Sequence, residues 1–278
     1  MRILSLFALA AILCVAASPA LAKEDLPTPH GDDVVEAALE RFDKDFAEGD
    51  LDDRIQILRW LGRHRHKDVA KALEKIWLHE KNLELVAVAG EGLGYQVSTP
   101  KRAGKALFKG LIKNKKLAGK SPVTDEERMQ EDLEASVLVN GIKSIGKLGF
   151  KADWKKMRGF IDHNNDDVAI AMIDLCATQK EYRAMPIIYE WFGHYPDGVS
   201  WSGGSVKVDT GAAGNKDRNA AKAKFKAKYG GRAKKARPDA FAAMVSCVKV
   251  LTGQEIKKRE ELKAWMDENK VFLKKHGV

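Results

Sequence analysis

Apolar residues recur at helical spacing through most of the chain, and they mark five successive amphipathic helices between residues 32 and 114. In one of these helices, Val69, Leu73, Ile76 and Trp77 lie along a single face. The helices come in pairs, and the first helix of two pairs closes on a Leu-Gly step, at residues 61–62 and 93–94. Neither pair could bury its apolar stripe alone, so we expect the pairs to stack.

The starts of the predicted helices are marked by residues that can accept hydrogen bonds from free backbone N–H groups. Thr124 and Glu127 form a capping-box pattern before a long helix. Pro186 interrupts an otherwise helical segment at residues 181–192, where we expect it to end or kink the helix. The other expected caps are Asp32 or Asp33, Asp68, Thr99, Asp153, and Asp166 or Asp167.

Residues 194–237 break the helical pattern. Apolar and polar residues alternate on both sides of Gly203-Gly204, which predicts a β-hairpin with a two-residue turn. Residues 215–229 then predict a Lys-rich helix, and the amphipathic pattern returns at Pro238.

The small residues that close the first helix of each pair define a repeat. These residues are Gly62, Gly94, Gly146, Cys176 and Thr252, at intervals of 32, 52, 30 and 76 residues. Two helices with short turns need roughly 30 residues. One period with insertions at about 114–134 and 194–237 therefore accounts for the chain. We predict an all-α fold, an α-solenoid of stacked helical hairpins with a small inserted β-hairpin and a Lys-rich helix.

The segments VAVAGEGLG (86–94), VAIAMIDLC (168–176) and RAMPIIYEWF (183–192) are similar to the HEAT-repeat family. The segment LTGQEIKKREELKAWMDEN (251–269) looks like the final repeat of exported bacterial HEAT-repeat proteins. The resemblance extends over most of residues 33–275 but leaves out the 194–237 insertion. It implies a curved α-solenoid that acts as a binding scaffold, usually without catalysis, and it carries over no catalytic residue.

The first 22 residues have the pattern of a signal peptide. Arg2 is followed by an almost wholly apolar run from Ile3 to Val15, and residues 20–22 form an A-x-A cleavage pattern. We expect the mature chain to begin at Lys23 and to be exported, either periplasmic or secreted. Residues 23–31 predict an exposed linker, because Pro27 and Pro29 disfavour both helix and strand.

The formal net charge of +9 is concentrated in two segments. Residues 216–237 hold ten Lys or Arg against one Asp, and residues 101–120 hold eight and no acidic residue. Such segments are either solvated helices or contacts for a polyanion, which could be nucleic acid, an anionic glycan or lipid head groups. The candidate partner-binding residues are Arg102, Lys105, Lys109, Lys222, Lys224, Phe225, Lys226 and Lys228.

Trp201 is a further candidate for partner binding. It lies near the tip of the expected hairpin, where an exposed aromatic side chain would anchor a partner. The alternative is that Trp201 packs back onto the helices.

Catalytic and metal-binding motifs are not evident in the sequence. His64 and His66 lack nearby metal ligands, and His79-Glu80 begins a zinc motif that fails because position 83 is Leu. Ser144 and Lys147 match S-x-x-K inside an apolar helix, without the companion motifs. We therefore predict no metal, no cofactor and no enzymatic activity, although a hydrolase with scattered residues stays an alternative.

Cys176 and Cys247 lie in apolar helical patterns, and the repeat register offsets them along neighbouring helices. We expect two free thiols there rather than a disulfide. Taken together, these features predict a non-enzymatic scaffold that binds another protein. The alternative function is the binding of envelope polyanions through the Lys-rich segments.

Overall fold

A computed structural model describes residues 31–119, 122–192, 199–202, 205–208 and 238–278. The fold is all-α, as the sequence predicts. The helices before the first insertion are α1 (Asp32–Glu48), α2 (Leu51–Gly62), α3 (Lys67–His79), α4 (Leu83–Gly94) and α5 (Pro100–Asn114). The later ones are α6 (Asp125–Lys147), α7 (Trp154–Met157), α8 (Asp166–Gln179), α9 (Met185–Phe192), α11 (Pro238–Thr252), α12 (Arg259–Glu268) and α13 (Lys270–Lys275), with 3-10 helices η1 (Arg158–Phe160) and η2 (Tyr182–Ala184).

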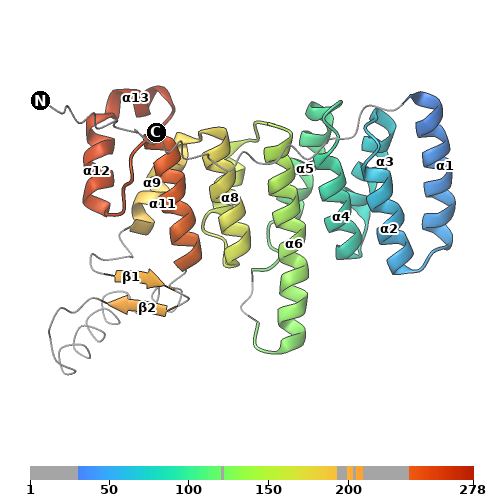
Figure 1. The fold of residues 1–278 in the computed structure, drawn as a ribbon, viewed down its shortest axis with the longest axis horizontal. Coiled ribbons are helices and arrows are strands. Elements are labelled where there is room, and N and C mark those ends of the chain that lie inside the picture. The colour runs from blue at the N-terminus through green and yellow to red at the C-terminus, as the bar shows by residue number, and fades with distance from the viewer. Residues whose placement is uncertain (1–30, 120–121, 193–198, 203–204, 209–237) are drawn as a thin grey trace, which may run out of the picture.

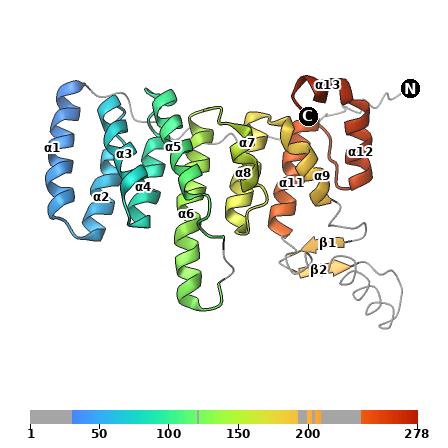
Figure 2. The same ribbon diagram turned by 180° about the vertical axis from the view of Figure 1, so that it is seen from behind.

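The helices follow one another along the long axis of the molecule, from α1 at one end to α12 and α13 at the other (Figure 1). Helices α2, α4, α6, α8 and α11 each contact the next in this order, and α3 and α5 contact each other beside them. Helix α6 is the longest of the described helices, and it extends past its neighbours on one edge of the row (Figures 1 and 2).

Trp77 on α3 joins four helices in the first half of the row. Its side chain is 1% exposed, and its indole N–H donates to the carbonyl oxygen of Ala106 on α5 at 3.0 Å. The indole lies directly against Gly90 on α4, Gly110 on α5 and Gly141 on α6. A Cβ added at Gly90 would come within 2.6 Å of the ring, and one at Gly110 would overlap it. The glycines therefore make room for the largest buried side chain of this region.

Gln96 fixes the ends of two neighbouring helices. Its side chain is fully buried, and its amide nitrogen donates to the carbonyl oxygens of Gly62 at 3.0 Å and His64 at 3.1 Å. Its amide oxygen accepts from the backbone N–H of His66 at 3.1 Å. Because a buried amide without partners would be costly, these bonds hold the turn after α2 against the end of α4.

Three of the predicted caps are wrong. Gly31 precedes α1 and provides no side-chain cap, His66 rather than Asp68 caps α3, and Asn165 rather than Asp166 or Asp167 caps α8. In α3 the imidazole accepts from the N–H of Asp68, and in α8 the amide oxygen accepts from two backbone N–H groups. The acidic residues lie in the first turn instead, where they favour the positive end of the helix dipole.

Of the other expected caps, two form the predicted hydrogen bonds and one does not. The Thr124–Glu127 capping box is present, and Asp153 caps α7. Thr99 precedes α5 with Pro100 at the first helical position, but its hydroxyl makes no capping bond. Pro186 does not end a helix; it lies in the first turn of α9, where a missing N–H costs nothing.

The predicted insertion at 114–134 is held against the rest of the row by side-chain hydrogen bonds. Inside the insertion, Glu134 accepts from the backbone N–H of Ala118 at 2.6 Å. From outside it, the His163 ring bonds the carbonyl oxygen of Leu117 at 3.0 Å. Asn164 donates to the carbonyl oxygen of Gly119 at 2.6 Å. Ala118 has a positive φ of 49°, so the loop turns sharply before it reaches α6.

Strands β1 (Val199–Ser202) and β2 (Ser205–Val208) pair antiparallel, with Trp201 opposite Val206. The expected turn at residues 203–204 and the Lys-rich helix expected at 215–229 lie outside the described residues. The expected signal peptide and linker, at residues 1–22 and 23–31, also lie outside them, apart from Gly31.

Candidate functional site

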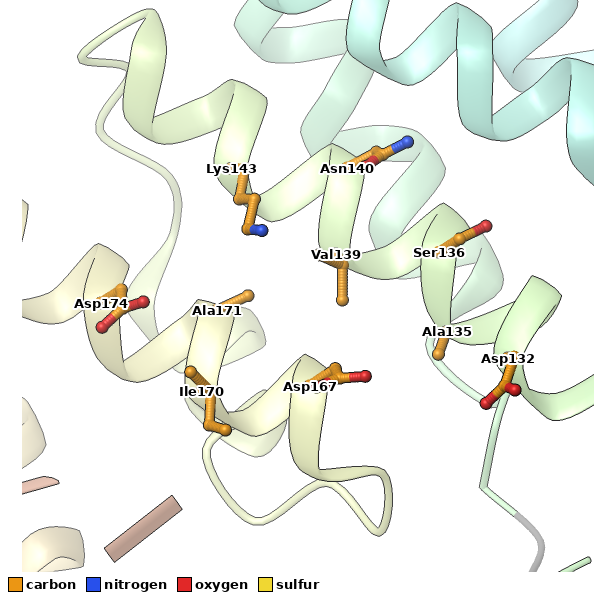
Figure 3. A pocket seen from close by; sticks show the side chains of 10 residues that line it. All are labelled: Asp132, Ala135, Ser136, Val139, Asn140, Lys143, Asp167, Ile170, Ala171 and Asp174. Atoms are coloured by element: carbon orange, nitrogen blue, oxygen red, sulfur yellow. The ribbon is translucent and has the colours of Figure 1, made fainter. Parts of the chain in front are cut away.

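A groove of about 330 Å³ runs between α6 and α8. Ala135 and Val139 from α6 and Ile170 and Ala171 from α8 supply its apolar lining. Figure 3 shows these side chains between the two helices, with charged side chains placed around them. The polar lining consists of Asp132, Ser136, Asn140 and Lys143 from α6 and Asp167 and Asp174 from α8.

Close to the C-terminal end of α6, the α6–α8 junction contains a large side chain. A Cβ added at Gly146 would only touch the methyl group of Leu175, at 3.4 Å, so the backbones do not meet there. At the preceding junction, by contrast, Gly94 on α4 lies directly against Ser144 on α6. Interaxial distance depends on the size of the side chains at the contact, and the two junctions differ in the side chains that meet there.

The groove carries an excess of negative charge. Asp132, Asp167 and Asp174 are exposed carboxylates, and Lys143 is the basic residue of the lining. Although Asp174 is exposed as a residue, neighbouring protein atoms partly desolvate its carboxylate and raise its pKa, while the Lys143 ammonium acts in the opposite direction. An apolar lining with carboxylates at its edge suits a ligand that has both aliphatic and cationic groups.

A second charged surface lies on α5 and includes three of the sequence-predicted residues. Arg102, Lys105 and Lys109 are exposed, on the side of α5 opposite buried Ala103 and Leu107. Arg102 forms an ion pair with Glu74 on α3 at 2.7 Å. Within the described residues, Lys105 and Lys109 have no ion-pair partner.

The other predicted partner-binding residues are not placed together with these three. Trp201 lies in β1. Lys222, Lys224, Phe225, Lys226 and Lys228 lie outside the described residues.

The two histidines of the α2–α3 turn have structural contacts. The His64 ring packs edge-on against Trp60 at 4.6 Å between centroids and bonds the Trp60 carbonyl oxygen at 3.1 Å. His66 caps α3 and contacts the Asp32 carboxylate at 2.8 Å. Across the described parts of the chain, His, Cys, Asp and Glu do not gather in a group of three that could hold a metal ion.

The S-x-x-K match at Ser144 also has a structural explanation. Ser144 is 2% exposed, and its hydroxyl fills the space beside Gly94. The Lys147 ammonium lies 4.6 Å from the centre of the Tyr95 ring. The serine is therefore a helix-packing residue, and its neighbour Lys147 makes a cation–π contact at the surface.

Cys176 and Cys247 are both buried and free, as expected from the repeat register. Burial raises the pKa of Cys247 to about 12 and that of Cys176 well above its usual range. Because the thiolate is the reactive form, both side chains are inert at neutral pH.

Sequence reasoning missed the α6–α8 groove. Its aspartates come from two helices that are far apart in sequence, and each one separately reads as an ordinary solvent-facing residue. A usable signal was present in Asp132, Ser136, Val139, Asn140 and Lys143, which recur at intervals of four, three, one and three residues along one side of α6.

Comparisons of the chain with family models, with curated proteins and with solved structures give no match. A search of the described helices for one that is long and apolar enough to cross a membrane also finds none.

Proposed function

We propose that the protein is a non-enzymatic binding scaffold, a HEAT-like α-solenoid that is exported and receives a segment of another protein in the α6–α8 groove. The observation that carries this proposal is the combination of apolar lining and carboxylate edge in one channel between adjacent helices. A row of helices that contact mainly their neighbours supports the solenoid interpretation. Such a row presents a long surface without requiring a catalytic centre.

The chemistry of the groove indicates which partner segments fit it. Ala135, Val139, Ile170 and Ala171 favour aliphatic side chains, since burying these groups removes apolar surface from water. Asp132 and Asp167 favour Lys or Arg at the edge of the groove. We therefore expect a partner segment in which basic and aliphatic residues alternate or share one face.

This proposal is tested with two labelled peptides and the chain from Lys23 to Val278. One short peptide alternates Lys with Leu and the other alternates Glu with Leu, and fluorescence anisotropy reports binding. We expect saturable binding of the Lys–Leu peptide. The double variant Asp132→Asn/Asp167→Asn should weaken it, and Val139→Phe, which partly fills the groove, should weaken it further.

A matched control removes two carboxylates elsewhere. Glu260 and Glu268 are exposed on α12, outside the groove, so Glu260→Gln/Glu268→Gln should leave binding unchanged. Equal weakening by both double variants would mean that only net charge matters. Equal binding of the Glu–Leu peptide would also contradict the proposal.

A further inference from the structure

Helix α5 carries a continuous basic stripe on its outer side. Its sequence contains five basic residues and no acidic residue. At 100° per residue, these five positions fall within an arc of about 120°. Ala103, Leu107 and Leu111 occupy the opposite, buried side of the helix. The basic residues are Lys101, Arg102, Lys105, Lys109 and Lys113, and all five are exposed.

The stripe continues onto the elements on either side of α5. Helix α3 is joined to α5 by the Trp77–Ala106 hydrogen bond, and it adds exposed Lys71 and Lys75. On the other side, the Lys156 ammonium lies 6.0 Å from the centre of the Phe108 ring of α5. We give the name α5 basic face to ten exposed basic residues of α3, α5, α7 and η1, leaving out Lys67 at the start of α3; they are Lys71, Lys75, Lys101, Arg102, Lys105, Lys109, Lys113, Lys155, Lys156 and Arg158.

Most of the positive charge of this face is not neutralised within the described residues. The acidic residues of α3 are Asp68 and Glu74, which pair with Lys71 at 2.6 Å and with Arg102 at 2.7 Å. No acidic residue occurs in α5, α7 or η1. Lys113 donates to the carbonyl oxygen of Leu78 at 2.6 Å. The other lysines are therefore available to a negatively charged ligand that extends over several helices.

The side chains of the face distinguish between kinds of polyanion. The large apolar side chains that are exposed in the described residues all lie on other elements, so this face lacks the apolar anchors of a membrane-binding surface. Phe108 is half-buried beneath Lys156, which leaves no open ring on which a nucleic-acid base could stack. Lysines act as point charges with rotatable donors, and they suit anions that repeat along a chain without a fixed orientation.

From this surface we infer a second binding site, separate from the α6–α8 groove: the α5 basic face binds an anionic polysaccharide whose carboxylate or sulfate groups run along α5. Helix α5 has 15 residues and is about 22 Å long, so several sugar units contact it at once. Binding arises mainly from the release of counterions, and it weakens steeply as salt concentration rises.

The probe for this site is a fluorescently labelled heparin oligosaccharide, titrated with the chain from Lys23 to Val278 at several salt concentrations. The test variant is Lys105→Gln/Lys109→Gln/Lys155→Gln, whose three exposed lysines have no ion pair within the described residues. We expect about tenfold weaker binding at low salt. The slope of the logarithm of affinity against the logarithm of salt should fall by roughly one for each contacting lysine removed.

The matched control removes the same charge from the end of the row. Lys270, Lys274 and Lys275 are exposed on α13, and Lys270→Gln/Lys274→Gln/Lys275→Gln should change affinity less than about twofold. A loss of similar size in both triple variants would overturn the inference. So would a larger loss from Lys222→Gln/Lys224→Gln/Lys226→Gln, because the site would then lie outside the α5 basic face.

Two further ligands test whether the α5 basic face prefers polysaccharide to other polyanions. Anionic phospholipid vesicles and single-stranded DNA are titrated at the same salt concentrations, and heparin should bind more tightly than either. Tighter binding of vesicles or of DNA would contradict the polysaccharide assignment. Because the Lys–Leu peptide tests the groove independently, failure of one proposal is distinguishable from failure of the other.

Discussion

The α4–α6 junction and the α6–α8 junction use the same long helix but pack it differently. On the α4 side, Gly94 of α4 lies directly against Ser144 of α6, and Gly141 of α6 makes room for the Trp77 ring of α3. On the α8 side, Leu175 stands between the helices. The groove lies along the second junction. The comparison shows that α6 meets a glycine of α4 on one side and a leucine of α8 on the other.

The largest expected effect comes from removing the Trp77 indole, which packs on the α4 side of α6. Trp77→Ala should lower the free energy of unfolding by about 3–5 kcal/mol, because it leaves a cavity among Gly90, Gly110 and Gly141 and removes the bond to Ala106. Denaturant unfolding followed by circular dichroism measures this change. A loss below about 1 kcal/mol would mean that the junction does not depend on this packing.

A matched pair of glycine substitutions sharpens the comparison. Gly94→Ala should destabilise by about 1–3 kcal/mol, because its methyl group would overlap Ser144 on α6. Gly146→Ala meets only the Leu175 methyl group at ordinary contact distance, so higher helix propensity should stabilise the protein by about 0.5–1 kcal/mol. Changes of the same sign in the two variants would refute the difference between the junctions.

The smallest expected effect concerns Asp174 in the groove. Since its pKa is raised in the folded state, the folded protein binds this proton more tightly than the unfolded chain. Its contribution to stability is therefore favourable at low pH and is lost as pH rises through the folded pKa. Asp174→Asn should raise the melting temperature slightly at neutral pH, and thermal unfolding at acidic pH should show this advantage disappear. A constant difference at all pH values would exclude the titration as its cause.

Hydrophobic spacing was enough to predict the helices because burial decides where their apolar faces lie. Val69, Leu73 and Trp77 are buried in α3 as the spacing indicates. Caps were harder, because several polar side chains near a helix start can accept the same bonds. His66 was therefore missed in favour of Asp68.

Some features could not be predicted from local sequence at all. Helix α7 has four residues and is continued by the 3-10 helix η1, although Trp154, Met157 and Ile161 keep helical spacing. The α6–α8 groove is lined by residues of two helices, and local sequence does not show that these residues come together. On α5, by contrast, the spacing of Arg102, Lys105 and Lys109 was sufficient to predict a shared face.

Hydrogen–deuterium exchange with each ligand in turn tests the central claim, that the molecule has two separate surfaces of opposite charge. The account predicts that the Lys–Leu peptide slows exchange in residues 132–143 and 166–174 and leaves α5 unchanged. It predicts that heparin slows exchange in residues 101–113 and leaves the groove unchanged. Protection of the same segments by both ligands, or of neither surface, would contradict it.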